Sequence, residues 1–261
     1  MNDKLNNSSS PMFSDSLMSA DDALSFLMES AVISDLTELA SLDDSIGRIL
    51  AEDIRSRINV PGFDNSAMDG YTIALDENNL SKENQTFNVV DRIAAGSIGN
   101  ELKKGNAARI FTGAPIPKGA NTVVMQEECE TSEDGSQITI KRAIELNENI
   151  RPTGNDILKN GVILNVGKKI EPEDISLAAS VGIGELKVYK KLKVGVFFTG
   201  DELVEPGQSL TPGKIYNSNR YALVALLKNA GCKVVNLGNI KDDFDSTCDA
   251  LEDLAKDCDL I

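Results

Sequence analysis

The residues best suited to chemistry lie in one short segment, positions 61 to 71, which reads PGFDNSAMDGY. It combines two carboxylates, Asp64 and Asp69, with the hydroxyl of Ser66. Its proline, glycines and asparagine predict an irregular loop that is neither helix nor strand. We expect this loop to be rigid and to present its acids to a ligand, although an ordinary surface turn would use the same residue types. Three large apolar residues are expected to anchor it by burial: Phe63, Met68 and Tyr71.

The composition limits the chemistry in which these acids can take part. The chain has no histidine, which excludes histidine-containing triads, histidine-ligated zinc and imidazole bases from this polypeptide. Acid–base or metal chemistry must then use carboxylates, hydroxyls, lysines or backbone groups, and a hard cation such as Mg²⁺ is favoured. The 41 acidic residues against 26 basic ones give a net charge of -15, which argues against binding to nucleic acid or to an anionic membrane surface.

Length and cysteine usage are typical of a multidomain cytoplasmic protein. At 261 residues the chain is expected to form two or three domains. Residues 1–16 are polar and rich in Ser and Asn, so we expect a disordered lead-in without a secretory leader, and no run approaches the roughly 20 apolar residues of a membrane span. The four cysteines form no CxxC pair and are expected to be reduced thiols: Cys129, Cys232, Cys248 and Cys258.

Three helices are predicted in the N-terminal and linker region, residues 17–190. The first is amphipathic and starts from an N-cap at Ser19. The second starts near Asp43, and the third starts at Pro172 and stops at Gly182. The second helix is expected to carry Ile46, Ile49 and Leu50 on one side, and the third to bury Ile175, Ala178 and Ala179.

A β-rich module at about 61–145 is the other predicted part of this region. Short β-like runs cut by turns are expected at 87–90, 108–111, 122–125 and 137–140, with one more beyond the module at 162–164. Two turns carry hydroxyl or carboxylate groups on Gly/Pro corners: Thr112–Pro115 and Arg151–Asp156. Active sites use such corners and ordinary turns use them too, so both interpretations stay open.

Residues 191–261 are predicted to begin a doubly wound parallel α/β domain. Strands at 192–198 and 233–237 alternate with two helices, the first capped by Ser218 or Asn219, and a third strand opens at 259. Because ligands of such sheets bind at the carboxyl ends of the strands, the turn at 199–202 and the turn at Asp242–Asp243 are site candidates. The second turn is also compatible with a solvated loop or a helix cap. Only the start of the third strand is present, so we expect this domain to be incomplete.

These segments together resemble the molybdopterin molybdotransferases, the molybdenum-insertion enzymes of molybdenum-cofactor biosynthesis that are related to the gephyrin E-domain. The resemblance covers nearly the whole chain after residue 16, with several separate motifs in the same order. The matching segments are PGFDNSAMDGY (61–71), RIFTGAPIP (109–117), VVMQE (123–127), Arg151 with Gly154 and Asp156, TGDEL (199–203) and IYNSN (215–219).

The resemblance implies an elongated homodimer that loads molybdate onto adenylylated molybdopterin with release of AMP and with Mg²⁺ as cofactor. The catalytic residues Asp69, Thr112 and Asp156 would come from one subunit and would face Glu202 and Asp242 of the other. The same two residues, Glu202 and Asp242, would bind the metal. Substrate contacts are assigned to Asn65, Ser66, Thr199, Asp201 and Asn219. The molybdopterin adenylyltransferase is an implied partner protein.

Some features depart from this family. The Ser-Gly-Gly-rich pterin-binding turn, later Lys/Pro/Gly segments and a C-terminal β-barrel are absent, so we expect a C-terminally truncated chain whose activity alone is in doubt. Asn121 and Asn217 stand where acids are common, and they are expected to alter local hydrogen bonding. Asp64 and Asn65 are expected to hold the shape of their own loop.

Two other functions remain open at this point. One is a non-catalytic gephyrin-like scaffold or interaction module, which would follow if the chain lacks a pterin pocket. The other is a generic Mg²⁺-nucleotide hydrolase, which is the weaker candidate because the chain has no Gly-x-x-x-x-Gly-Lys-Ser/Thr loop. The predicted fold class is therefore α/β plus a β-rich module, in a multidomain chain.

Overall fold

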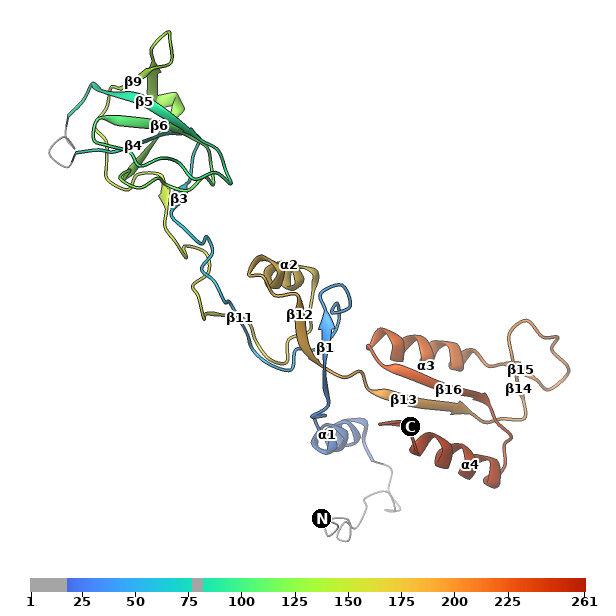
Figure 1. The fold of residues 1–261 in the computed structure, drawn as a ribbon. Helices are drawn as coiled ribbons and strands as arrows, with labels where there is room; N and C mark the ends of the chain where they lie inside the picture. The colour runs from blue at the N-terminus through green and yellow to red at the C-terminus, as the bar shows by residue number, and fades with distance from the viewer. Residues whose placement is uncertain (1–17, 77–81) are drawn as a thin grey trace, which may run out of the picture. The chain divides into compact units, whose positions relative to one another are not determined.

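The computed structural model describes residues 18–76 and 82–261, and the chain divides into two units, residues 1–36 and 37–261 (Figure 1). The predicted disordered lead-in, residues 1–16, lies outside the described residues. The first unit contains α1 (Ala20–Ser30), and its N-cap is Ser19 as predicted. The Ser19 side chain accepts a hydrogen bond from the backbone N–H of Asp22 at 3.1 Å. None of the side chains of α1 is buried, and its large apolar residues are exposed: Leu24, Phe26, Leu27 and Met28.

The predicted second helix near Asp43 is wrong. Residues 42–48 form consecutive turns, and Ile49 and Leu50 then make isolated bridges to Lys169 and Val188. Gly47 has a φ of +71°, which a helix would not allow, so the chain turns there. Leu50 is fully buried while Ile46 is 51% exposed, which shows that strand contacts, not a helical face, bury the apolar residues here.

Two short antiparallel pairs and a helix build the first core of the second unit. β1 (Thr37–Ser41) pairs with β12 (Glu185–Tyr189), and β2 (Ile54–Arg55) pairs with β11 (Val162–Leu164). α2 (Pro172–Ser180) starts at the predicted proline. Gly182, with a φ of +77°, follows the helix end as predicted. Ala178 is buried as expected, whereas Ala179 is exposed because it lies on the outer side of this helix.

The β-rich module is a six-stranded sheet with the order β7-β4-β6-β5-β9-β8. Only β5 and β6 run parallel; the other neighbours are antiparallel. All four strands predicted inside the module are present, whereas β4 and β8 were not predicted from the sequence. The strands are β4 (Gly70–Ile73), β5 (Gln85–Ile93), β6 (Asn106–Ile110), β7 (Thr122–Met125), β8 (Cys129–Thr131) and β9 (Gln137–Ile140), with the 3₁₀ turn η3 (Gln126–Glu128) after β7.

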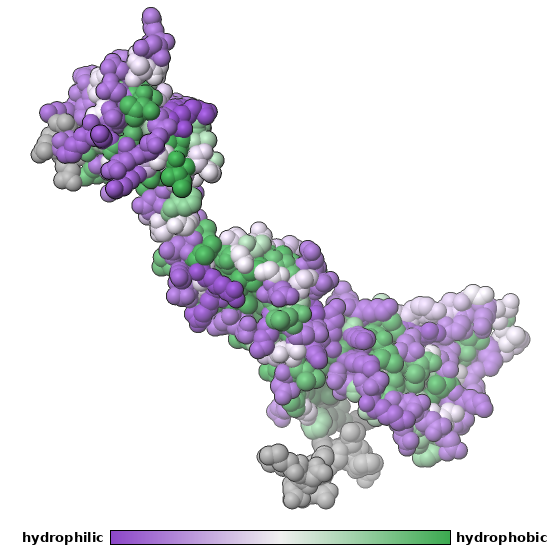
Figure 2. Space-filling view, in the orientation of Figure 1, coloured by the Kyte–Doolittle hydropathy of each residue, from purple (hydrophilic) through white to green (hydrophobic). Residues whose placement is uncertain are grey.

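Both faces of this sheet are covered. Successive residues of one strand enter different apolar clusters: Val123 packs with Ile93 and Ile110, and Val124 packs with Phe87 and others. Because side chains alternate between the faces of a strand, the uninterrupted apolar run of β7 means that both of its faces are buried. The surface seen in Figure 2 is nevertheless mostly hydrophilic, in keeping with the net charge of -15.

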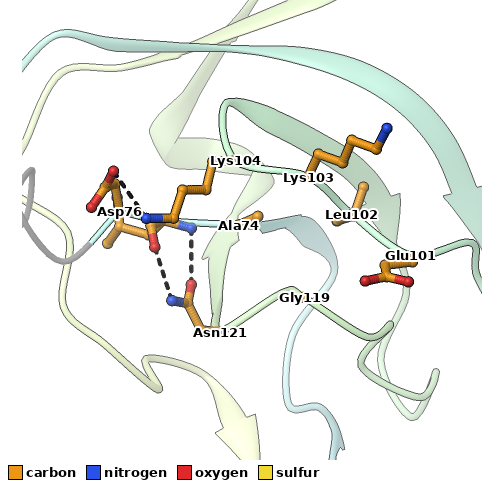
Figure 3. A pocket seen from close by; sticks show the side chains of 9 residues that line it. Ala74, Asp76, Glu101, Leu102, Lys103, Lys104, Gly119 and Asn121 are labelled. Carbon is orange, nitrogen blue, oxygen red and sulfur yellow. Dashed lines mark hydrogen bonds and ion pairs between the residues drawn. The ribbon is translucent and has the colours of Figure 1, made fainter.

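A pocket of about 570 Å³ opens beside β4 and β6 (Figure 3). None of the predicted site residues lines this pocket, so it is not the predicted site. Asn121 lies at its wall and makes two hydrogen bonds with the backbone of Leu75, accepting from N–H at 2.9 Å and donating to the carbonyl at 3.0 Å. A carboxylate could only accept, so the asparagine satisfies a carbonyl that an acid would leave unpaired.

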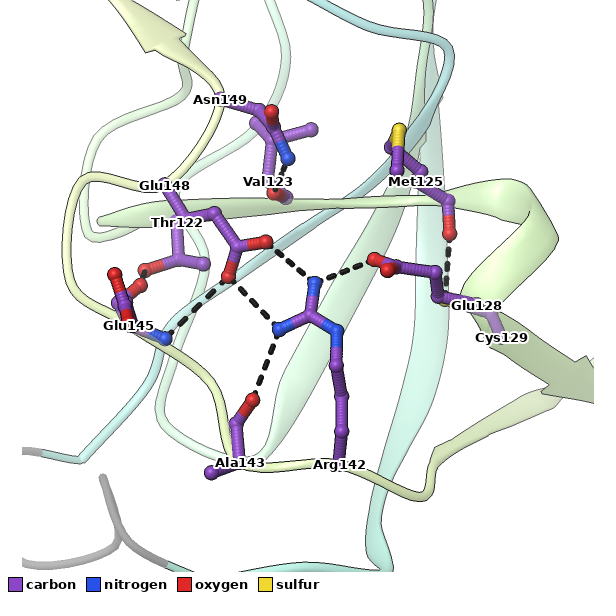
Figure 4. A network of polar contacts seen from close by, with 10 residues as sticks. All are labelled: Thr122, Val123, Met125, Glu128, Cys129, Arg142, Ala143, Glu145, Glu148 and Asn149. Atoms are coloured by element: carbon purple, nitrogen blue, oxygen red, sulfur yellow. Dashed lines mark hydrogen bonds and ion pairs between the residues drawn. The ribbon is translucent and has the colours of Figure 1, made fainter.

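An ion network joins two other parts of the module (Figure 4). Arg142 pairs with Glu128 of η3 and with Glu148. It also donates to the carbonyl of Ala143 at 2.9 Å. The hydrogen bonds that Arg142 donates, first to the carboxylate of Glu148 and then to that of Glu128, raise the pKa of Arg142. The network therefore fixes η3 against the segment that follows β9.

The C-terminal region has the predicted βαβαβ order. β13 (Lys193–Phe198) and β16 (Lys233–Asn239) are parallel, and Leu260 adds a parallel bridge to Val194. The helices are α3 (Ser218–Asn229) and α4 (Phe244–Ala255). The N-cap of α3 is Asn217, not Ser218 or Asn219, because the Asn217 side chain accepts the backbone N–H of Arg220. Among the described residues, every helix is too short or too polar to cross a lipid bilayer.

Candidate active site

The segment 61–71 is more regular than its composition predicts. Asn65 and Ser66 form β3, which pairs with β10 (Ile150–Arg151), and β4 begins at Gly70. The prediction that buried apolar residues anchor this segment is wrong for two of the three, since Phe63 is 50% exposed and Met68 is 41% exposed. Backbone pairing and polar contacts hold the segment instead.

Two polar residues in the middle of the segment are buried. Asn65 is 4% exposed and Ser66 is 0% exposed. Ser66 donates its hydroxyl to the carbonyl of Met68 at 2.5 Å and accepts the Met68 N–H at 3.3 Å. The Oδ1 atom of Asn65 is buried without a hydrogen-bond partner among the described residues. Substrate contact by Asn65 or Ser66, which stays a prediction, would therefore require this segment to open.

Asp69 and Thr112 form a hydrogen-bonded pair, although they are 43 residues apart. Asp69 Oδ1 accepts from both the backbone N–H and the hydroxyl of Thr112, each at 2.8 Å. These two hydrogen bonds, and to a smaller extent the charge of Arg109, lower the pKa of Asp69. Gly113 follows with a φ of +80°, which lets the chain turn sharply behind Thr112. The two most specific predicted site residues are thus brought together, and Asp69 is held ionised.

Arg109 supports this pair from β6. Its Nη1 donates to the carbonyl of Gly70 at 2.6 Å and to that of Ile110 at 3.1 Å. Its guanidinium lies over the rings of Phe111, at 4.6 Å, and Tyr71, at 5.3 Å. Cation–π contacts of this kind restrict the side chain. The sequence contained Arg109 within a recognisable motif, but nothing in its spacing indicated that it clamps the residue after Asp69.

Asp156 is exposed and lies beside the start of the same segment. Its backbone N–H donates to the carbonyl of Val60 at 2.9 Å, and the Asn155 amide donates to its Oδ1 at 2.8 Å. Gly154 donates to the carbonyl of Pro61 at 2.9 Å. Asp64 does not hold its own loop as predicted, because its carboxylate bonds Thr153, 89 residues away. Hydrogen bonds therefore join the turn 151–156 to the segment that carries Asp69.

A second group of predicted residues lies at the carboxyl ends of β13 and β16. The backbone N–H of Ile240 donates to the carbonyl of Phe198 at 2.9 Å, so the turns that follow the two strands begin side by side. Thr199, Asp201 and Glu202 of the first turn are at least partly exposed, as are Asp242 of the second and Asn219 in the first turn of α3. The parallel topology has brought these turns to one sheet edge, as the sequence predicted.

The neighbouring acids Asp242 and Asp243 differ in role. Asp243 is the N-cap of α4 and accepts the N–H of Ser246 at 2.7 Å, a hydrogen bond that lowers its pKa. Asp242 makes no hydrogen bond or ion pair within residues 18–76 and 82–261. The helix-cap interpretation thus holds for one acid and leaves the other carboxylate open to solvent.

Asn217, just before α3, and Asn239, at the end of β16, are hydrogen-bonded to each other beside these turns. Neither residue was assigned to the site from the sequence. The Asn217 Nδ2 donates to Asn239 Oδ1 at 2.6 Å, while its own Oδ1 caps α3. Asn217 is buried, and its backbone N–H donates to the carbonyl of Val204 in β14 (Leu203–Val204), which pairs with β15 (Ile215–Tyr216). An acid at Asn217 could cap the helix but could not donate to Asn239.

The carboxylates suit a hard cation only in part. In the described part of the chain, no three His, Cys, Asp or Glu residues lie close enough together to hold a metal ion. Mg²⁺ is commonly held by one or two carboxylates, with waters and substrate phosphates filling the other positions. Exposed Glu202 and Asp242 fit that mode, and their role as ligands stays a prediction.

Residues 18–182 match the family model described as MoeA N-terminal region (domain I and II). Residues 195–261 match the model described as probable molybdopterin binding domain.

Curated relatives agree with these matches. The chain is 42% identical over 227 residues to the molybdopterin molybdenumtransferase of Haemophilus influenzae, covering 87% of this chain and 55% of that protein. It is 38% identical over 230 residues to the molybdopterin molybdenumtransferase of Bacillus subtilis, covering 86% and 54%. The chain thus spans about half the length of the curated relatives it matches.

A solved structure shares the fold. The crystal structure of the molybdopterin biosynthesis moeA protein from Pyrococcus horikoshii OT3 superposes with a TM-score of 0.84 and 31% identity. The match covers 92% of this chain and 64% of that one.

Proposed function

Because this chain belongs to the family of the MoeA N-terminal region, we propose that it supplies the N-terminal part and the molybdopterin-binding part of a molybdopterin molybdenumtransferase. The reaction proposed is transfer of molybdenum from molybdate to adenylylated molybdopterin, with release of AMP. The observation that carries the proposal is the Asp69–Thr112 pair, an ionised carboxylate fixed at an exposed corner within two of the family's motifs.

Asp69 is proposed to orient a reactant and not to remove its proton. Its lowered pKa makes it a weak base, which is poorly suited to proton abstraction near neutral pH. One oxygen, Oδ1, already accepts two hydrogen bonds from Thr112, so the orientation of the carboxylate is fixed. The other oxygen, Oδ2, accepts no hydrogen bond from residues 18–76 or 82–261 and can accept one from a water or a substrate hydroxyl.

Thr112 is proposed to act through Asp69. Its hydroxyl proton is donated to the carboxylate, so it cannot be donated to a phosphate at the same time. Thr112, which the resemblance implies to be catalytic, is in this proposal a positioning residue. Its substitution should then affect turnover by releasing Asp69.

Glu202 and Asp242 are proposed to bind Mg²⁺ together with the substrate phosphates. Two exposed carboxylates alone would repel an anionic phosphate, so a cation is needed between them. Mg²⁺, when bound, would offset the negative charge that develops as the phosphoanhydride is cleaved. Thr199, Asp201 and Asn219, at the same edge, are proposed to contact the substrate.

A homodimer is proposed to complete the site. Asp69, Thr112 and Asp156 of one subunit would face Glu202 and Asp242 of its partner. Both groups are accessible in the single chain and so are free to contribute to such a cleft. The molybdopterin adenylyltransferase, which would supply the adenylylated substrate, is the proposed partner protein.

The test is Mg²⁺-dependent turnover of adenylylated molybdopterin and molybdate by the full-length protein. Asp69→Asn and Glu202→Gln are each expected to lower kcat on the order of 100-fold, the usual scale for loss of one electrostatic contact at a reacting centre. Asp253→Asn is the control, because Asp253 is exposed on α4 and, among the described residues, pairs only with Lys256 one turn away. Wild-type turnover in both site variants would refute the assignment. A protein that fails to bind the adenylate in a titration would favour the scaffold alternative.

A further inference from the structure

We propose that Asp64 is a positioning residue that fixes Asp156 relative to the Asp69–Thr112 pair, an inference that rests on the proposed function. Asp64 bonds two different turns. Its backbone carbonyl accepts the N–H of Ile116, just beyond the Thr112 turn, at 2.9 Å. Its carboxylate Oδ1 accepts the N–H of Thr153 at 2.7 Å and the Thr153 hydroxyl at 2.8 Å.

The Asp64–Thr153 contact repeats the geometry of the Asp69–Thr112 contact. In both, one carboxylate oxygen accepts the backbone N–H and the hydroxyl of a single threonine. In both, the threonine precedes a glycine in the left-handed region: Gly113 has a φ of +80° and Gly154 a φ of +75°. One short segment therefore carries two equivalent contacts, one for each Thr-Gly turn. We call each of them a latch: a carboxylate oxygen that accepts both the N–H and the hydroxyl of one threonine.

The latch at Asp64 is continuous with the turn that carries Asp156. That turn is also bonded to the residues before Asp64, since Gly154 donates to Pro61 and Asp156 donates to Val60, each at 2.9 Å. Any shift of Thr153 away from Asp64 must be taken up within the few residues before Asp156. The position of the Asp156 carboxylate is thus tied to Asp64.

The other connection runs from Asp64 to Thr112. Besides the bond from Ile116, Gly113 donates to the carbonyl of Ser66 at 2.8 Å, and Ser66 donates to the carbonyl of Ala114 at 3.0 Å. These bonds hold β3 directly against the Thr112 turn. Asp64 therefore links the two turns through its backbone on one side and its carboxylate on the other.

Position, and not stability, is the property that such a latch controls. Asp64 is exposed, so its hydrogen bonds to Thr153 compete with water and contribute little to folding. A displacement of about 1 Å in a catalytic group can nevertheless cost on the order of 100-fold in rate. A loosened latch should therefore change kcat much more than it changes the melting temperature.

The test compares Thr153→Val with Thr153→Ser. Valine keeps the shape and the N–H but removes the hydroxyl donor, whereas serine keeps both donors. Thr139→Val is the matched control, because it removes a threonine hydroxyl on β9 whose one hydrogen-bond partner in the described part of the chain is Thr86. The first measurement is amide hydrogen exchange of residues 153–157 by mass spectrometry, which needs no turnover. Thr153→Val is expected to speed exchange about tenfold, as loss of one charge-assisted hydrogen bond implies.

The second measurement is turnover by the full-length protein. Thr153→Val is expected to lower kcat about tenfold or more with KM for molybdate nearly unchanged, and Thr153→Ser is expected to restore both exchange and kcat. Unchanged exchange in Thr153→Val would refute the latch. Faster exchange with wild-type kcat would refute the positioning role while leaving the proposed function intact. A wild-type protein without turnover would refute the proposed function itself and, with it, the positioning role of Asp64.

Discussion

Among the glycines, Gly70 is the one whose added Cβ would come nearest to another atom, and Gly70→Ala is expected to destabilise the β-rich module strongly. A Cβ added at Gly70 would lie 2.0 Å from the carbonyl oxygen of Val124 and 3.1 Å from the Cα of Met125. These are backbone atoms of β7, so no rotation of a side chain can relieve the clash. The strands themselves must separate.

The cost follows from the ladder that this separation breaks. To restore an ordinary contact, β4 must move about 1 Å from β7, which stretches N–H···O bonds beyond their useful range. Gly70 is opposite Met125 on one side and Ile110 on the other, so the strand is held in the middle of the sheet. Losing two or three bonds at about 1 kcal/mol each, with some overpacking, gives roughly 2–4 kcal/mol.

The assay is thermal and urea unfolding of Gly70→Ala beside Gly184→Ala. A Cβ added at Gly184 would meet open space within 4 Å, and the φ of Gly184 is not positive, so alanine there is expected to be neutral or slightly stabilising. A loss of this size should lower the Tm of Gly70→Ala by about 5–15 °C. Because Gly70 follows Asp69 and its carbonyl binds Arg109, the pKa of Asp69 should also rise toward its ordinary value. Equal stability of the two variants would refute the steric argument.

Two further predictions concern titration. The hydrogen bonds from Ser132 and Ser136 lower the pKa of Asp134 from 3.8 to about 2. Between these two pH values the unfolded chain therefore binds more protons than the folded chain. The contribution of ionised Asp134 to folding stability is complete above pH 3.8 and is lost as the pH falls through about 2. Ser132→Ala should raise this pKa in an NMR titration, and an unchanged value would contradict the cause given. Burial, and to a smaller extent the charge of Glu128, raises the pKa of Cys129 from 9.0 to about 11. At pH 8 the thiolate fraction of Cys129 should therefore be about 100-fold below that of an ordinary thiol. Mass spectrometry of iodoacetamide-treated protein should show slow labelling of Cys129 until the pH approaches 11, and rapid labelling at pH 8 would contradict the shift.

Local patterns in the sequence were sufficient for much of the architecture. Apolar runs between turn residues predicted β7 and β9 at their observed bounds, because a strand buried on one or both faces needs such a run. The proline at position 172 and the glycine at 182 located α2 for reasons contained in their own backbone preferences. Alternation of strand and helix after residue 191 predicted the parallel pairing and hence the sheet edge that carries Glu202 and Asp242.

Tertiary contacts decided what local preference could not. Ile49 and Leu50 have helical spacing with Ile46, yet pairing with residues 169 and 188, more than 100 positions away, made them part of a β structure. Polar residues, too, found partners that no spacing reveals.

For the site, the sequence by itself determined which residues are available: acids, threonines and glycines in motifs, with no histidine to compete. Only the tertiary structure decided that Thr112 belongs to Asp69 and Thr153 to Asp64, across 43 and 89 residues. The physical reason is that a carboxylate accepts any donor that the fold brings within about 3 Å, and the fold's long-range strand pairing chooses that donor. The segment 61–71 contains the acids Asp64 and Asp69, and the turns that carry Thr153 and Thr112 fix the positions of their carboxylates.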